Sequence, residues 1–199
     1  MSNAVEPESF YIVGNNLALD FINSATHEMT GENLAEWAST VSLIDEPEMN
    51  RITQRWQGSD VSGVSLFRDR LRQIVVTLVD SKDVFTEDIG WINLILRRKI
   101  GYSELAKTAD GFTKQSKVDL REPKDIAPPI IEAFVDMISF GNIEYVRKCE
   151  RPDCILYFYD TTKNHKRRWC SMAICGNRAK VSKFYKKRKT RIPDAEPLT

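Results

Sequence analysis

Apolar residues recur at helical spacing through the first two thirds of the chain. The clearest case is the segment 66–79, where Leu71, Ile74, Val75 and Leu78 form one apolar face between charged positions. A Pro128-Pro129 pair fits the first turn of a later helix. The spacing predicts helices over residues 15–25, 33–43, 48–56, 66–79 and 87–100, and a last one from Pro128 to about Tyr145 that leads into the C-terminal segment.

A second pattern interrupts the helices. Between residues 103 and 119, short polar-alternating runs flank an Asp110-Gly111 dipeptide, which is typical of a β-hairpin. The sequence therefore predicts an α+β fold that is mainly α: a helical N-terminal domain over residues 1–145 with a small β-hairpin element.

The charge distribution divides the chain at about residue 146. Residues 1–146 hold 14 basic and 23 acidic residues, whereas residues 147–191 hold 15 basic and three acidic ones. A basic segment attached to an acidic body indicates a module that binds a polyanion. No apolar stretch approaches the roughly 20 residues of a membrane span, and residues 1–10 lack the features of a secretory signal. We therefore expect a cytoplasmic protein without a membrane partner.

The four cysteines all lie in this basic segment. Cys149 and Cys154 form one C-x4-C pair, Cys170 and Cys175 form another, and fifteen residues separate the pairs. Two close pairs joined by a loop can place four thiolates tetrahedrally around one zinc ion. In a cytoplasmic chain this spacing favours metal binding over disulfides. The sequence predicts one structural Zn²⁺, with ordinary buried thiols as the alternative.

The residues around the cysteines predict a small module with its own elements. Residues 155–159 have strand character, residues 167–169 can return as a second strand, and residues 179–188 favour a helix. Together they indicate a treble-clef-like zinc module over residues 146–191, followed by a tail over residues 192–199. His165 lies in the loop between the two cysteine pairs. It is a further candidate zinc ligand, or else a phosphate contact or a simply exposed residue.

Two segments resemble a known family. The run RRWCSMAICGNRAKVSKFYKKRK, preceded by KCERPDCILYFYDTTKNHK, resembles the CGNR-type zinc finger of bacterial proteins, with Cys175-Gly176-Asn177-Arg178 as its namesake. In such proteins the finger follows an ABATE domain, and the stretch GNNLALDFINSAT from Gly14 is similar to the start of that domain. The resemblance implies a stress-induced transcription regulator with a ligand-sensing N-terminal half.

Basic and amide side chains of the finger are candidates for nucleic-acid binding. Contacts with phosphates would give affinity with a steep salt dependence, and Arg and Asn side chains can also read base edges. The helix start near Asn177 adds backbone N–H groups that favour a phosphate. Asn177 and Arg178 have a second interpretation as hydrogen-bond donors that support the zinc thiolates. The candidates are Lys163, Lys166, Arg167, Arg168, Asn177, Arg178, Lys180, Lys183 and Lys187.

The N-terminal domain shows no catalytic motif, because the sequence lacks a Gly-rich phosphate loop, a nucleophile elbow and an HExxH motif. Four polar residues, Asn16, Asp20, Asn23 and His27, recur at spacings of four, three and four in the first predicted helix. They form either a solvated face or the wall of a pocket for a small-molecule effector.

The predicted function is DNA-binding transcription regulation without enzymatic activity. RNA or ribosome association is the alternative, because the charge pattern does not select between the two nucleic acids. An enzyme in which the finger is structural is a further alternative, because Asp20 and His27 could in principle perform acid–base chemistry. A single finger reads few base pairs, so we also expect a homodimer.

Overall fold

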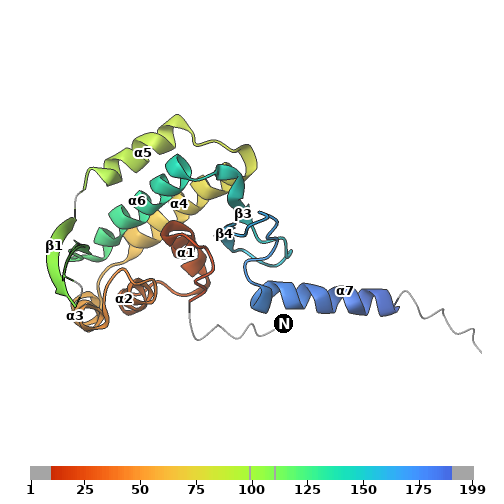
Figure 1. Ribbon diagram of the computed structural model, residues 1–199, viewed down its shortest axis with the longest axis horizontal. Coiled ribbons are helices and arrows are strands. Elements are labelled where there is room, and N and C mark those ends of the chain that lie inside the picture. The colour runs from red at the N-terminus through yellow and green to blue at the C-terminus, as the bar shows by residue number, and fades with distance from the viewer. Residues whose placement is uncertain (1–9, 99, 110, 190–199) are drawn as a thin grey trace, which may run out of the picture.

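The computed structural model describes residues 10–98, 100–109 and 111–189, and Figure 1 shows their arrangement. Helices dominate the body, and two short antiparallel β-pairs complete it. The helices are α1 (Leu17–Asn23), α2 (Gly31–Thr40), α3 (Glu46–Trp56), α4 (Ser62–Ser81), α5 (Thr86–Leu96), α6 (Ala127–Phe140) and α7 (Asn177–Lys189), and the strands are β1 (Gly101–Thr108), β2 (Gly111–Val118), β3 (Val146–Lys148) and β4 (Tyr157–Tyr159).

Helix α1 lies at the centre of the body, packed against α4, α6 and β4 (Figure 1). Its residues Leu19, Phe21 and Ile22 are fully buried. The Phe21 ring meets the Trp37 ring of α2 edge-on at 5.1 Å and the Phe67 ring of α4 at 5.4 Å. Burial of these large apolar side chains from several helices is the main source of the body's stability.

Helices α2 and α3 each begin after a residue whose side chain caps the first turn. Thr30 and Asp45 cap the two helices, because their side chains accept hydrogen bonds from the backbone N–H groups of Asn33 (3.1 Å) and Glu48 (2.9 Å). A Cβ atom at Gly31 would lie 2.1 Å from the Trp56 carbonyl oxygen, so only glycine allows this approach of α2 to the end of α3.

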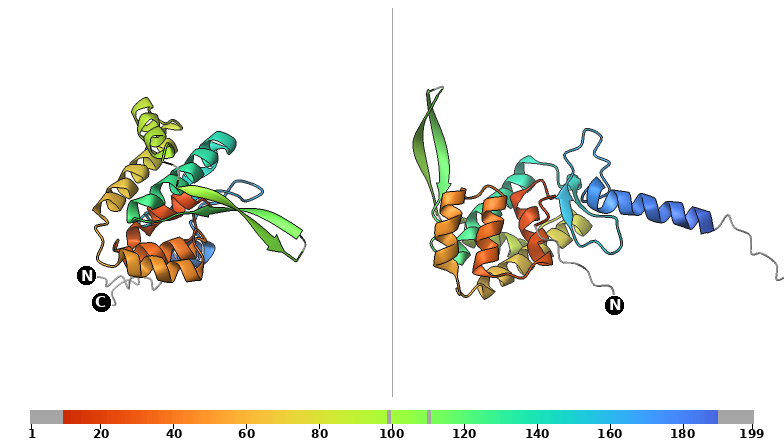
Figure 2. Two further views of the ribbon diagram at one scale, coloured as in Figure 1. Left: turned by 90° about the vertical axis from the view of Figure 1, so that its left-hand side faces the viewer. Right: turned by 90° about the horizontal axis from the view of Figure 1, so that it is seen from below.

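The predicted β-hairpin is confirmed. Strands β1 and β2 pair from Gly101↔Val118 to Thr108↔Gly111. Gly111 has a φ of 127°, which favours glycine where the ribbon reverses. The ribbon projects from the body beside α3, and α7 extends at the opposite end of the molecule (Figures 1 and 2). Asp110, the other residue of the predicted turn, lies outside the described residues.

Four predicted helices end earlier than the sequence suggests, and two of them are α2, which stops at Thr40 rather than residue 43, and α5, which stops at Leu96 rather than residue 100. Helix α1 stops at Asn23, and residues Ser24–Thr26 tighten into a 3₁₀ turn in which the Ser24 hydroxyl donates to the Phe21 carbonyl at 2.6 Å. Helix α6 stops at Phe140, and Gly141 turns into an extended conformation. Tyr159 of β4 stabilises this exit, because its hydroxyl oxygen accepts from the Asn142 N–H at 3.0 Å.

None of the helices in the described part of the chain combines the length and hydropathy that a membrane span requires. The predicted tail, residues 192–199, falls outside the described residues.

Candidate metal centre and nucleic-acid interface

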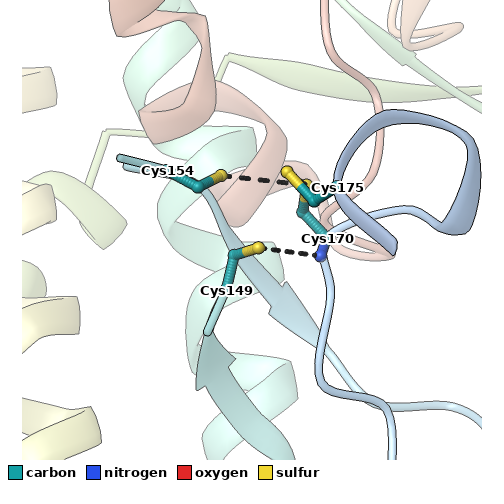
Figure 3. A group of neighbouring side chains, drawn as sticks. All are labelled: Cys149, Cys154, Cys170 and Cys175. Carbon is teal, nitrogen blue, oxygen red and sulfur yellow. Dashed lines mark hydrogen bonds between the residues drawn. The ribbon is translucent and has the colours of Figure 1, made fainter. Parts of the chain in front are cut away.

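The four cysteines converge on one point, as Figure 3 shows. Cys149 follows β3, Cys154 ends a turn in which its N–H donates to the Arg151 carbonyl at 3.0 Å, and Cys175 lies in a π-helical turn, Met172–Gly176, just before α7. All four are buried, and their Sγ atoms lie within 4.8 Å of one another. Cys154 and Cys170 approach to 3.9 Å, and Cys170 and Cys175 to 3.5 Å.

These separations fit one tetrahedral zinc ion. A Zn–S bond of about 2.3 Å places thiolates about 3.8 Å apart, close to the observed values. Disulfides would need sulfurs about 2.05 Å apart, and the four thiols are free. The four cysteines therefore form a structural zinc site, as predicted. A zinc ion bound there would supply a rigid crosslink between the two cysteine turns.

Hydrogen bonds support the sulfurs. The Cys170 N–H donates to Cys149 Sγ at 3.3 Å, and Arg151 Nη1 donates to Cys175 Sγ at 3.8 Å. This contact with the Cys175 sulfur raises the pKa of Arg151. Sequence reasoning assigned the supporting role to Asn177 or Arg178 and missed Arg151, although its position between the first two cysteines was a usable signal.

The thiols also affect one another's ionisation. Hydrogen bonding with Cys170 lowers the pKa of the Cys154 thiol to about 5, and the same contact raises the pKa of Cys170. This coupling favours ionisation of the Cys154 thiol over that of Cys170. Zinc binding must release the protons of the thiols, so zinc affinity falls at low pH.

The strand pairing around the cysteines differs from the prediction. We expected residues 155–159 to pair with residues 167–169, but β4 pairs with β3, from Val146↔Tyr159 to Lys148↔Tyr157. Residues 167–169 form no strand, and a single backbone hydrogen bond, from the Glu150 N–H to the Arg168 carbonyl at 2.9 Å, joins the described backbone of this segment to the first cysteine turn. The partner strand lies before Cys149, where three residues were too short to show a β pattern.

Exposed cations surround the zinc site. Lys163, Lys166 and Arg168 lie in the loop before Cys170, and Arg178 and Lys180 lie in the first turns of α7; all five are exposed. Asn177 is exposed at the start of the same helix. The side chains of Lys183 and Lys187 lie outside the described part of the structure.

An open groove runs beside the basic loop, with a volume of about 770 Å³. Lys163, Lys166 and Arg168 line it, and Trp169 and Met172 contribute apolar surface. The Arg168 guanidinium lies 5.1 Å from the centre of the Trp169 ring, and its Nε donates to Glu150 at 2.6 Å.

Comparison with known families agrees with this arrangement. Residues 15–140 match the ABATE family, which carries the description "Putative stress-induced transcription regulator". The protein belongs to the ABATE family. Residues 145–188 match the CGNR zinc finger. A search of the curated proteins found no match. Both halves of the predicted resemblance are confirmed, and we call the matched segments the ABATE region and the CGNR finger.

Arg167 has a different role in the CGNR finger from the predicted one. Its Nη2 donates to the carbonyl oxygens of Val13 (2.9 Å) and Cys170, its Nε donates to the Trp169 carbonyl at 3.0 Å, and its guanidinium lies 4.2 Å from the centre of the Phe158 ring. Burial lowers the pKa of this arginine, against the effect of the Asp160 carboxylate. The Arg167 guanidinium is thus committed to the finger's interior rather than to phosphates.

Asp160, which sequence reasoning did not select, organises the loop that carries the lysines. Its fully buried carboxylate accepts from the N–H (3.0 Å) and hydroxyl (2.6 Å) of Thr162 and from the Arg167 N–H at 2.8 Å. Burial alone would raise the pKa of Asp160, but these hydrogen bonds hold it below its usual value. His165 stacks on Tyr145 at 3.6 Å and its Nδ1 lies 3.0 Å from the Asp160 carbonyl, so it is not a zinc ligand.

Within the polar stripe of the first helix, Asn23 joins the ABATE region to the finger and Asn16 joins α1 to α6. Asn23 is fully buried; its Nδ2 donates to the Tyr157 carbonyl at 2.8 Å, and its Oδ1 accepts from the Tyr157 N–H at 2.9 Å. Asn16 caps α1 by accepting from the Ala18 N–H and donates to the Ala133 carbonyl, both at 2.9 Å.

The other two stripe residues are also engaged. Asp20 accepts from the Gly14 N–H at 2.7 Å. His27 lies beyond the end of α1, where its Nδ1 is 2.9 Å from the Thr26 hydroxyl and its ring packs on Phe10 at 4.5 Å. None of the four stripe residues lines any of the four main pockets of the described residues. The predicted pocket wall is therefore a set of internal connectors, because α1 is buried on all sides.

Arg72 of α4 is a further connector that the sequence did not reveal. Its Nη2 donates to the Ile155 carbonyl of the finger at 2.6 Å, and its Nη1 donates to the Ile22 carbonyl at the end of α1 at 3.3 Å. A cation at a helix C-terminus also interacts favourably with the helix dipole.

Proposed function

We propose that the protein is a cytoplasmic transcription regulator that binds double-stranded DNA through its CGNR finger and a small-molecule effector through its ABATE region. The observation that carries the DNA-binding half is the set of exposed cations on one module: Lys163, Lys166, Arg168, Arg178 and Lys180. Of these, Arg168 alone has an ion pair among the described residues, with Glu150 at 2.6 Å. Such solvated charges can exchange counterions for phosphates.

The helix α7 adds a second element of recognition. The side chains of its first residues, Asn177 and Arg178, are exposed and make no hydrogen bond within the described part of the chain, whereas the Asn177 backbone N–H donates to the Met172 carbonyl of the preceding π-helical turn. The helix start predicted to offer free backbone N–H groups at Asn177 is preceded by this turn, so the support for DNA contact comes from the exposed side chains, of which the Arg178 guanidinium can reach a guanine edge. This placement supports Arg178 as a DNA contact over its alternative role beside the thiolates, which Arg151 fills.

RNA is the second candidate, and the groove favours it. An indole and a thioether within a groove lined by cations suit an unpaired base, which single-stranded or looped RNA presents and duplex DNA does not. The Trp169 ring is already partly covered by Arg168, so a base would have to stack on what remains exposed.

We also propose a binding protein rather than an enzyme. Asp20 and His27, the pair that could perform acid–base chemistry, are held apart in separate internal contacts, with Asp20 on Gly14 and His27 on Phe10. A finger of this size spans few base pairs, so we expect two copies on each target, which light scattering of the complex would measure.

The test of DNA binding uses the full-length, zinc-loaded protein. Sequences are selected from random duplex DNA and structured RNA pools, and the affinity for the best ones is measured against salt. If Lys163 and Lys166 contact phosphates, Lys163→Gln with Lys166→Gln lowers the slope of log affinity on log salt by about two, equally for all sequences. The control is Lys107→Gln with Lys114→Gln, exposed lysines of the hairpin at the other end of the molecule (Figure 1).

Arg178→Ala completes the test. If Arg178 reads a base, its loss weakens binding to a selected site by about 1–3 kcal/mol, weakens binding to random DNA much less, and leaves the zinc content unchanged. Selection of RNA in preference to DNA would replace the DNA proposal with the RNA one. Salt-independent binding that the lysine substitutions leave unchanged would contradict both.

A further inference from the structure

A cavity of about 280 Å³ lies in the ABATE region, between α4, α5 and the start of α6. Its apolar wall includes Phe67 and Ile126, both buried, and Trp91, whose ring stacks on Phe67 at 5.7 Å with an interplanar angle of 29°. The volume is close to the lower end of ligand pockets, about 300 Å³. The space therefore suits one small ring or a short branched chain.

Cations supply the polar part of the wall. Arg70, Arg98 and Lys124 line the cavity, and the described part of the chain contributes no carboxylate to its lining. Each of these cations already pairs with an acid: Lys124 with Glu122, Arg70 through Nη2 with Asp88 at 2.5 Å and Glu87 at 3.7 Å, and Arg98 through Nη2 with Asp125 at 2.9 Å. In each arginine Nη2 makes these contacts, which leaves the other guanidinium nitrogens for a further acceptor.

Arg70 shows that such an acceptor is missing. Its Nε is buried and has no hydrogen-bond partner among the described residues. A buried donor without a partner costs roughly 1–3 kcal/mol, so native structures rarely leave one unless something else supplies the acceptor. A ligand carboxylate in the cavity would supply it once the Arg70 guanidinium turns to meet it, because the Nε is covered in the present arrangement.

We propose that this cavity binds a small apolar monocarboxylate, with its apolar part against Phe67 and Trp91 and its carboxylate toward Arg70. This inference names the effector class and rests on the sensing half of the proposed function. The cavity is also connected to the finger: the Phe67 ring contacts Phe21 of α1 at 5.4 Å, and Asn23 at the end of α1 holds Tyr157 of β4.

Two glycines provide a blocking variant and its matched control. Gly63 of α4 lines the cavity, and a Cβ there meets no atom within 4 Å, so Gly63→Leu places a side chain at the cavity without a clash. Gly90 of α5 is equally open but does not line the cavity. Gly90→Leu therefore carries the same helical glycine-to-leucine change without the block.

The experiment titrates the full-length, zinc-loaded protein by calorimetry with benzoate, phenylacetate and hexanoate, and with their neutral amides. We expect at least one carboxylate to bind at least tenfold more tightly than its amide. Gly63→Leu should weaken that binding at least tenfold, Gly90→Leu should leave it unchanged, and Arg70→Lys should weaken it by removing the Nε donor while keeping the charge.

The proposal is overturned if no carboxylate binds, if the amides bind as well, or if Gly63→Leu has no more effect than Gly90→Leu. Nucleic-acid affinity is measured separately with and without the bound carboxylate. Carboxylate binding that leaves this affinity unchanged would confirm the site and refute the sensing half of the proposed function, so the two failures are distinguishable.

Discussion

Asp20 gives a pH dependence of stability opposite to that of most carboxylates. Only 5% of it is exposed, and its Oδ1 accepts the Gly14 N–H at 2.7 Å. Burial raises the pKa of Asp20 to about 6 from 3.8, although hydrogen bonds from Gly14 and Val13 and the charge of Arg167 oppose the rise. The folded protein therefore holds this proton at a pH where the unfolded chain has already released it.

The perturbation is Asp20→Asn, which removes the ionisation and keeps a side-chain oxygen for Gly14. Between the two pKa values the unfolded chain binds fewer protons than the folded protein, so ionisation of Asp20 makes the wild type less stable as pH rises. From the two pKa values this penalty is about 1.6 kcal/mol at pH 5 and about 2.9 kcal/mol at pH 7. The advantage of the variant should grow by about 1.3 kcal/mol over that interval.

The assay is urea unfolding of both zinc-loaded proteins at pH 5, 6 and 7, read as the difference in the free energy of unfolding. The zinc-linked contribution cancels in this difference because both proteins carry the same cysteines. Any fixed effect of the amide group shifts the three values equally. A difference that is flat, or that falls as pH rises, would show that the Asp20 carboxyl is not the buried acid described above.

Two further predictions concern the junction and the metal. Asn23→Ala leaves the buried N–H and carbonyl of Tyr157 unpaired, so the free energy of unfolding should fall by about 2–4 kcal/mol. The control, Asn50→Ala at an exposed position, should lower it by less than about 0.5 kcal/mol. Equal effects of the two substitutions would show that the Asn23–Tyr157 hydrogen bonds do not stabilise the junction. Metal analysis should find about one zinc per wild-type chain and none in Cys154→Ser. In a chelator competition, Arg151→Ala should bind zinc about 10–100-fold more weakly than the wild type. Full zinc retention by both variants would contradict the proposed ligands and their support.

The sequence predicted elements that depend on short-range patterns. The apolar face around Leu71 and Ile74 correctly predicted α4, and the residues suited to a tight turn near Gly111 correctly predicted the hairpin. Both predictions depend only on residues that are close together in the sequence. The zinc ligands could be predicted equally well, since the cysteine side chains and the spacing of each pair can be read from a short stretch of sequence.

The sequence could not predict contacts between distant segments. The polar spacing of Asn16, Asp20 and Asn23 is the same for a solvated face and for a buried helix that uses its polar groups as connectors. Which of these holds depends on β4, whose Tyr157 lies 134 residues from Asn23 along the chain. Arg167 was misassigned for the same reason: its partner at Val13 is 154 residues away, and an arginine in a basic run looks like a phosphate contact until that partner is known.

These connectors have a consequence for how the finger can be regulated. The outer edge of β4 bonds to the N-terminal segment, through Asn23 on Tyr157 and through the Gly14 carbonyl, which accepts from the Tyr159 N–H at 2.7 Å. The groove beside the basic loop is itself lined by Ile12, Val13 and Asn15 together with finger residues. The finger is thus held as part of the body rather than tethered to it, and a displacement of α1 would move β4 and the groove together. If the proposed ligand binds against Phe67, a shift of α1 alone would therefore reach the proposed nucleic-acid surface.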